Sequence, residues 1–115
     1  VIMANWIMNK KVTLKDVSIQ GIRNVTLQTL EEAAKRNCTI KLIGSINGNL
    51  KVKPTEISRH DPLSVGGVLN AVTFVSEFVG EETIIGRGAG GMETASAILR
   101  DLLGIKHNLA TTLIA

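Results

Sequence analysis

The stretch Ile84-Ile85-Gly86-Arg87-Gly88-Ala89-Gly90-Gly91-Met92-Glu93-Thr94-Ala95 decides the fold of the C-terminal part of this chain. Two β-branched residues lead into four glycines within six positions, and an apolar-periodic segment follows at once. This order predicts a strand, a tight turn and the start of a helix. Because glycine has no Cβ, a ligand can approach the backbone of such a turn closely. The free N–H groups of the helix would point at the same place and favour an anion or a polar cofactor edge.

Three interpretations of the glycines are open. Gly86, Gly88 and Gly91 match the spacing G-x-G-x-x-G, but a dinucleotide fingerprint also needs a βαβ unit and an acidic residue about 20 positions further on. Too few residues follow Gly91 in this chain to hold a doubly wound sheet. The turn could instead be purely structural, without a ligand. We favour a third interpretation, in which the turn backbone is a wall against a cofactor held mainly by another domain.

The composition describes a small aliphatic unit. The 115 residues correspond to one domain at most, and a 44% hydrophobic content with 20% charged residues suffices for a core. The net charge of +3 comes from scattered Lys and Arg, and only Trp6, Phe74 and Phe78 are aromatic. Neither a basic stripe nor stacking aromatics are present, so the composition argues against nucleic-acid binding.

Candidate metal ligands and nucleophiles are few. Cys38 is the single cysteine of the sequence, so an intramolecular disulfide is excluded and a metal site cannot form from it alone. We expect Cys38 to behave as a small buried apolar residue. His60 and His107 lie far apart without ligand spacing, and we expect His107 to face solvent at a helix end. The sequence therefore predicts no metal site and no catalytic residue of its own. No apolar run is long enough to span a membrane.

The first third of the chain predicts a helix end, an irregular segment and a helix. The apolar residues 1–8 resemble the last two turns of a helix and lack the basic lead of a signal peptide, so we expect a fragment. Residues 12–22 predict a short strand or turns. Thr26 is a typical N-cap, and Asn37 can close the helix in the left-handed conformation. Between them, Glu31 and Glu32 precede Lys35 and Arg36 by four residues, which predicts i,i+4 pairs on a solvated face.

Two hairpins are expected next. In the first, residues 39–46 place Ile40, Leu42 and Ile46 on one side, and Asn47-Gly48 is a strong turn signal. Leu50 and Val52 then face inward, Lys51 and Lys53 protect an edge, and the strand ends at Pro54 or runs at an edge. Residues 57–68 predict a loop. The second hairpin has Val72, Phe74 and Phe78 on one face, a turn at Gly80, and a strand over 82–85.

The last helix is expected to bury Ala95, Ile98, Leu99, Leu102 and Leu103. Gly104 would end it, with Lys106 and His107 near the negative end of the helix dipole, and residues 109–115 would add a short strand. The elements together predict an α+β fold, with a mainly antiparallel sheet from the two hairpins and helices packed on one face.

The order of these motifs resembles the C-terminal part of homoserine dehydrogenase over residues 1–105. The resemblance lies in Gly21-Ile22 with Thr26, Ile40-Lys41-Leu42-Ile43, Val52-x-Pro54, His60 through Asn70-Ala71-Val72, Gly86-x-Gly88-Ala89-Gly90-Gly91-x-x-Thr94-Ala95-Ser96-Ala97, and Asp101-Leu102. The glycine and Thr-Ala-Ser-Ala block is the most specific part. One departure is Asp61 between His60 and Pro62, which we interpret as a local loop change.

The resemblance implies an oxidoreductase that interconverts L-homoserine and L-aspartate 4-semialdehyde with NAD or NADP, in the threonine and methionine branch of amino-acid biosynthesis. It implies a cytoplasmic homodimer with a small-molecule substrate. It also implies that the dinucleotide-binding domain, the catalytic lysine and the substrate-binding acidic residues lie outside this sequence. Residues 1–115 would then be a C-terminal fragment of the substrate domain and inactive alone.

The resemblance assigns a cofactor contact to the backbone of Gly90, and Gly88 and Ala89 would line the same wall. No role is carried over to His60. An alternative from another class stays open at this point: a non-enzymatic α+β module for ligand binding or dimerisation, in which the glycine turn is structural.

Overall fold

The computed structural model describes residues 1–112, with side chains up to residue 107. The chain divides into two compact units, Val1–Ser64 and Val65–Ala115. The first holds a three-stranded sheet of order β1-β3-β2, and the second a two-stranded sheet of β4 and β5. The α+β class and the mainly antiparallel pairing are confirmed. The two hairpins nevertheless form separate sheets, whereas the sequence predicted one.

In the first unit, α1 (Ile2–Trp6) is followed by two 3₁₀ turns, Leu14–Asp16 and Ile22–Asn24, on either side of β1 (Val17–Ile19). This agrees with the short strand and turns predicted for residues 12–22. The side chain of Asn5 holds this segment because it both donates to and accepts from the backbone of Val12, each at 2.8 Å. The amide thus provides partners for both backbone polar groups of Val12.

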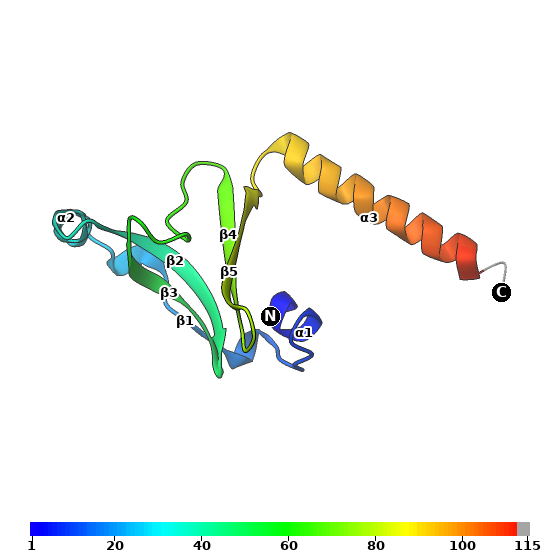
Figure 1. The fold of residues 1–115 in the computed structure, drawn as a ribbon, viewed down its shortest axis with the longest axis horizontal. Coiled ribbons are helices and arrows are strands. Elements are labelled where there is room, and N and C mark those ends of the chain that lie inside the picture. Colours follow the sequence, from blue (N-terminus) through cyan, green and yellow to red (C-terminus); the bar gives the residue numbers. More distant parts are fainter. Residues whose placement is uncertain (113–115) are drawn as a thin grey trace. The chain divides into compact units, whose positions relative to one another are not determined.

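β2 (Cys38–Asn47) and β3 (Asn49–Ser58) form the predicted hairpin, with Gly48 at the turn at φ 68° (Figure 1). The register places Ile46 opposite Leu50 and Gly44 opposite Val52, so the expected apolar residues of the two strands project to the same side. Leu42 also lies on this side but is 54% exposed. Leu50 is buried at 7% exposure. β1 pairs in parallel with β3 on its other side.

Pro54 does not end β3, which continues to Ser58. The carbonyl of Val52 accepts a hydrogen bond from the Gln20 N–H at 2.8 Å, so the backbone groups of Val52 point towards β1. Because backbone direction alternates along a strand, Pro54 points to the same side, just beyond the end of β1 at Ile19. The missing N–H therefore falls where β3 has no neighbour on that side, as the edge interpretation requires.

The expected role of the lysines as edge protection is wrong for Lys51. This residue lies between Ser18 of β1 and Ser45 of β2, in the middle of the sheet. Its side chain is exposed because it projects from the face opposite Leu50.

α2 (Leu27–Lys35) begins and ends as predicted. The Thr26 hydroxyl accepts from the Thr29 N–H at 3.2 Å, and Asn37 adopts φ 56° directly after the helix. Ala33 is buried at 1% exposure. The predicted i,i+4 pairing of Arg36 is wrong, because this side chain pairs with Glu56 of β3 instead.

In the second unit, β4 (Leu69–Ser76) and β5 (Gly80–Arg87) form an antiparallel hairpin in which Gly80 adopts φ 81°. The hydroxyls of Thr73 and Thr83 lie 2.8 Å apart across the strands. Phe78 does not share a face with Val72 and Phe74 as predicted. It lies in the turn after β4 and is 94% exposed.

α3 (Gly91–Thr112) extends well past the predicted end at Gly104, because the helix continues through this glycine (Figure 1). Lys106, His107 and residues 109–112 are therefore helical, and the expected terminal strand is wrong there. Residues 113–115, the rest of that prediction, lie outside the described residues. The expected buried stripe is also wrong for this chain, because Ile98, Leu99, Leu102 and Leu103 are all 56–58% exposed.

Candidate functional site

The glycine turn connects two elements of the second unit. β5 ends at Arg87 and α3 begins at Gly91, so Gly88, Ala89 and Gly90 form the connection. The N–H groups of Gly88 and Ala89 both donate to the carbonyl of Val68, at 3.1 and 3.4 Å. The turn is thus anchored to the residue before β4, and the three residues that the sequence singled out lie together in one exposed loop.

The geometry requires the two inner glycines to different degrees. Gly90 adopts φ 131°, and a Cβ there would collide with the carboxylate of Glu93. A Cβ on Gly88 would lie 2.8 Å from Cγ of Asn70. By contrast, a Cβ on Gly86 or Gly91 would meet nothing within 4 Å. The backbone conformation therefore requires a glycine at Gly90, whereas Gly88 only gives room to the side chain of Asn70, and the full G-x-G-x-x-G set is not required.

The start of α3 is held at Gly90. The carbonyl of Gly90 accepts from the Thr94 N–H at 3.1 Å and from the Thr94 hydroxyl at 2.8 Å. The amides of the first helical turn have no partner within the helix. Glu93 lies in that turn, and its carboxylate accepts from Nε of Arg87 at 2.9 Å. The Arg87–Glu93 pair carries no net charge, so the positive end of the helix and its free amides still favour an anion or a polar cofactor edge.

The dinucleotide-fingerprint interpretation fails within the described residues. The strand before the glycines pairs antiparallel with β4, and the residues up to 112 form no βαβ unit around them. The exposed turn is compatible with the favoured interpretation, a backbone wall against a cofactor.

The residues that sequence reasoning missed are Asn70, Arg87 and Glu93. Asn70 fills the space beside Gly88, and the ion pair of Arg87 with Glu93 spans the turn. Opposite charges on the two sides of the glycines were the available signal. Two residues six positions apart are not in contact within a regular helix or a single strand, so the turn between Arg87 and Glu93 brings their side chains together.

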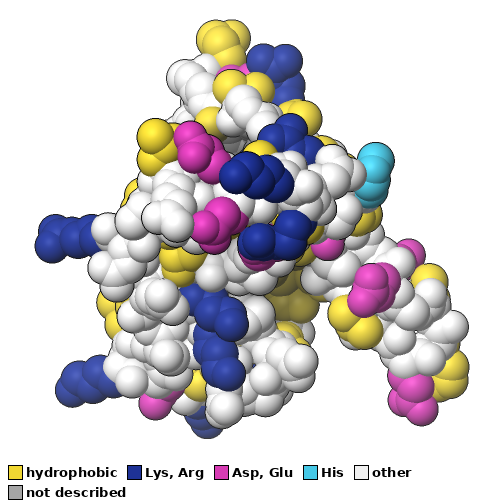
Figure 2. All heavy atoms as spheres, turned by 90° about the vertical axis from the view of Figure 1, so that its left-hand side faces the viewer, with side chains coloured by type: hydrophobic (Ala, Val, Ile, Leu, Met, Phe, Trp, Pro, Cys, Tyr) yellow, Lys and Arg dark blue, Asp and Glu magenta, His cyan; other side chains and the backbone are white. Residues whose placement is uncertain are grey.

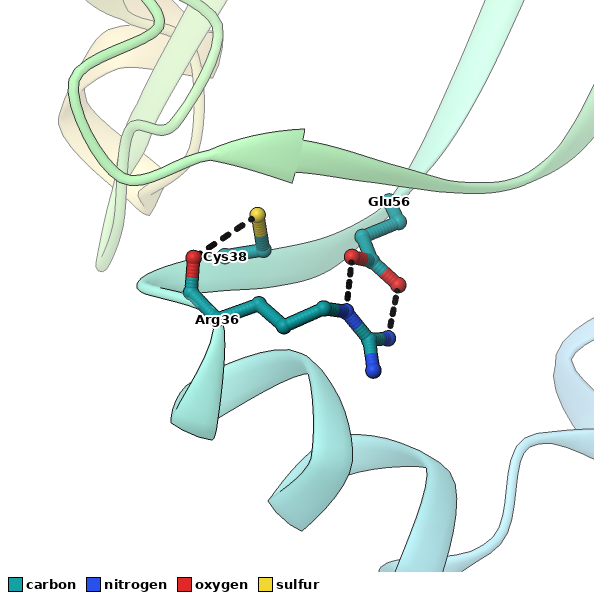
Figure 3. A network of polar contacts seen from close by, with 3 residues as sticks. All are labelled: Arg36, Cys38 and Glu56. Atoms are coloured by element: carbon teal, nitrogen blue, oxygen red, sulfur yellow. Dashed lines mark hydrogen bonds and ion pairs between the residues drawn. The ribbon is translucent and has the colours of Figure 1, made fainter.

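A second polar network lies in the first unit (Figure 3). Nε and Nη2 of Arg36 donate to the two carboxylate oxygens of Glu56 at 3.0 and 2.7 Å. This bidentate contact lowers the pKa of Glu56 below its ordinary value and raises the pKa of Arg36. Cys38 lies beside them, half-buried rather than buried as predicted, and its thiol donates to the Arg36 carbonyl at 3.5 Å. The network joins the end of α2 to the sheet.

His60 lies in the turn after β3, where its Nε2 is 3.2 Å from Nδ2 of Asn37. Asp61 stabilises this turn because its carboxylate accepts from the Leu63 N–H at 2.8 Å. Asp61 is therefore a side-chain cap on the turn, and the expected loop change relative to the family stays a prediction.

The described residues contain no group of three or more His, Cys, Asp or Glu that could hold a metal ion. Within the same residues, no helix is both long and apolar enough to cross a membrane. Figure 2 shows Lys and Arg side chains intermixed with Asp and Glu on the face in view, not gathered in one patch.

Comparison with known proteins identifies relatives of the whole chain. It is 48% identical over 109 residues to a homoserine dehydrogenase of Methanocaldococcus jannaschii, covering 94% of this chain and 32% of the relative. It is 41% identical over 118 residues to an NAD(+)-dependent homoserine dehydrogenase of Pseudomonas canavaninivorans, covering 96% of this chain and 33% of the relative. The crystal structure of Staphylococcus aureus homoserine dehydrogenase matches with a TM-score of 0.76 and 34% identity, covering 96% of this chain and 29% of that one.

The chain thus spans about a third of the length of the curated relatives that it matches. A sequence model described as homoserine dehydrogenase matches residues 1–103, which include the glycine turn and the start of α3. On this match and on the relatives, the chain belongs to the homoserine dehydrogenase family.

Proposed function

We propose that this chain is the C-terminal part of the substrate domain of an NAD(P)-dependent homoserine dehydrogenase. The whole enzyme would interconvert L-homoserine and L-aspartate 4-semialdehyde for threonine and methionine synthesis, as a cytoplasmic homodimer. Family membership supports the reaction, and the single structural observation that supports a role for this segment is the exposed glycine turn. NAD or NADP fits the proposal, and one relative is named as NAD(+)-dependent.

The proposal divides the work between this chain and the rest of the enzyme. We assign the nucleotide-binding domain and the catalytic lysine to the two thirds of the relatives that this chain does not match. Residues 1–115 would supply no proton donor or acceptor to the reaction. These residues would position and enclose the cofactor, and they would keep water away from the reacting atoms.

We assign the cofactor contact to the backbone of Gly88, Ala89 and Gly90. The cofactor, when bound, supplies or accepts the hydride. The absence of side chains at Gly88 and Gly90 lets a flat ring approach the peptide groups closely. The neighbouring Arg87–Glu93 ion pair leaves little net charge, which suits the uncharged carboxamide end of a nicotinamide.

The test uses a chimaeric enzyme, in which this chain replaces the segment that it matches in the M. jannaschii homoserine dehydrogenase. We expect the isolated 115-residue chain to show no NAD(P)-dependent oxidation of homoserine, and the chimaeric enzyme to show it. The M. jannaschii enzyme is the positive control, and the chimaeric enzyme carrying an alanine at its catalytic lysine is the negative control.

Turnover by the isolated chain would contradict the assignment of the catalytic lysine and the nucleotide-binding domain to the rest of the enzyme. A folded but inactive chimaeric enzyme would overturn the proposed function. If the isolated chain then bound an amino acid in isothermal titration, the non-enzymatic module would be the better description.

A further inference from the structure

The exposed glycine turn has few restraints of its own. Glycine-rich backbone loses more conformational entropy on ordering than any other, and a loop that orders only when ligand binds weakens that binding. Two backbone contacts to Val68 hold one end of the turn, and Thr94 holds the Gly90 carbonyl. The Arg87–Glu93 pair is the contact between described side chains that closes over the turn from strand to helix.

The pair and the glycine depend on each other. The Glu93 carboxylate occupies the space in which a Cβ of Gly90 would lie, so Gly90 at φ 131° makes room for the side chain that pairs with Arg87. The side chain of Glu93 is only 26% exposed, although the glycines around it are exposed. The pair thereby links Arg87, the last residue of β5, to the first turn of α3.

We propose that Arg87 and Glu93 are positioning residues, whose ion pair holds the peptide groups of Gly88–Gly90 in the conformation that contacts the cofactor. This inference rests on the proposed function. It adds two side chains to a contact that the family resemblance assigns to backbone alone. Because the pair acts on the free enzyme before binding, its loss changes cofactor affinity and leaves the chemical step as it is.

The experiment measures steady-state kinetics of the chimaeric enzyme with the variants Glu93→Gln and Arg87→Gln. An exposed ion pair contributes only a small free energy, so we expect its loss to raise the KM for NAD(P) about two- to fivefold. We expect kcat to stay within about twofold, since the pair touches no reacting atom. The matched control is Arg36→Gln, which breaks the bidentate surface pair with Glu56 in the other unit and is expected to leave the cofactor KM unchanged.

The charge-reversed double variant R87E/E93R separates positioning from general destabilisation. We expect it to bring the cofactor KM back towards the unmodified value, whereas either single reversal raises it. An unchanged KM in Glu93→Gln, or a proportional loss of kcat in every variant, would overturn the inference. An inactive parent chimaera would instead overturn the proposed function, so the two failures are distinguishable.

Hydrogen exchange at the amides of residues 88–90 gives a readout that does not depend on turnover. We expect this exchange to accelerate in Glu93→Gln.

Discussion

At the scale of single residues, the turn shows that glycines in one motif have different tasks. Gly90 holds a backbone conformation that side-chain-bearing residues rarely adopt, and Gly88 lies against Asn70. Gly86 and Gly91 face open space with ordinary backbone angles. Substitutions at these positions therefore test geometry rather than the motif as a pattern.

We predict that Gly90→Ala in the chimaeric enzyme raises the KM for NAD(P) about tenfold or more, because the strained backbone costs about 1–3 kcal/mol and the new Cβ displaces Glu93. Steady-state kinetics with varied cofactor provide the measurement. The neighbouring Gly91→Ala is the matched control and should stay close to the unmodified enzyme. Equal effects of the two variants would contradict the prediction.

Glu56 provides a pH-dependent contribution to stability. Hydrogen bonds from Arg36 lower the pKa of Glu56 in the folded state. A lowered folded-state pKa stabilises the protein above the unfolded pKa of a glutamate, about 4.3, and this contribution is lost as the pH falls through the folded value. We predict that Glu56→Gln lowers the urea midpoint of the chimaeric enzyme at pH 7 and that this deficit shrinks as the pH is lowered to 3.

The control for this measurement is Glu31→Gln, an exposed glutamate on α2. Its midpoint should match the unmodified protein at both pH values. A deficit of Glu56→Gln that is equal at pH 7 and pH 3 would show that the side chain acts through packing and not through its charge.

At the scale of elements, local sequence signals predict the ends of α2 correctly but not the end of α3. Thr26 and Asn37 bound α2 where the sequence predicts, because each forms its cap with groups in its own turn. Gly104 carries the same apparent stop signal, yet α3 continues through it. A glycine disfavours a helix by only about 1 kcal/mol, and long apolar and charged residues on both sides outweigh it.

We predict that Gly104→Ala increases the helicity of this chain and stabilises α3 by about 0.5–1 kcal/mol, because alanine loses less backbone entropy and meets nothing within 4 Å. Circular dichroism at 222 nm over a temperature ramp measures the change. Gly104→Pro should reduce the helical signal, whereas Gly21→Ala, outside the regular helices and strands, serves as the neutral control. If Gly104→Ala leaves helicity unchanged, the helix does end near this residue in solution.

At the scale of the whole molecule, apolar surface is the main feature. Among the described side chains, the buried hydrophobic ones are Ala4, Ala33 and Leu50. Trp6 is 85% exposed, Phe78 is 94% exposed, and the large apolar residues of α3 between Met92 and Ile105 are more than half exposed. A two-stranded sheet is marginally stable alone. This surface agrees with the proposal that the rest of the enzyme contacts these residues.

We predict that the isolated chain binds the dye ANS and unfolds over a broad temperature range, because so little apolar surface is buried. The chimaeric enzyme should bind less dye per chain and unfold cooperatively. Fluorescence titration and scanning calorimetry on the two proteins make the comparison. A sharp unfolding transition without dye binding for the isolated chain would contradict this prediction.

The sequence by itself determined the caps of α2, the turn at Asn47-Gly48, the alternating faces of the strands and the glycine connection before α3. These features depend on residues within a few positions of one another, where backbone preference and side-chain capping decide the outcome. Family membership was also predictable, because the Gly-x-Gly-Ala-Gly-Gly and Thr-Ala-Ser-Ala block is unusual.

The tertiary structure alone decided that the hairpins form two sheets, that β1 lies beside β3, and that Arg36 pairs with Glu56 instead of a helix neighbour. It also decided that Glu93 closes over Gly90 to reach Arg87. The sheet arrangement and the Arg36–Glu56 pair depend on which distant segments approach one another, and a pattern with a period of two or 3.6 residues carries no information on that approach. The Arg87–Glu93 contact spans only six residues and depends on how the chain turns between them.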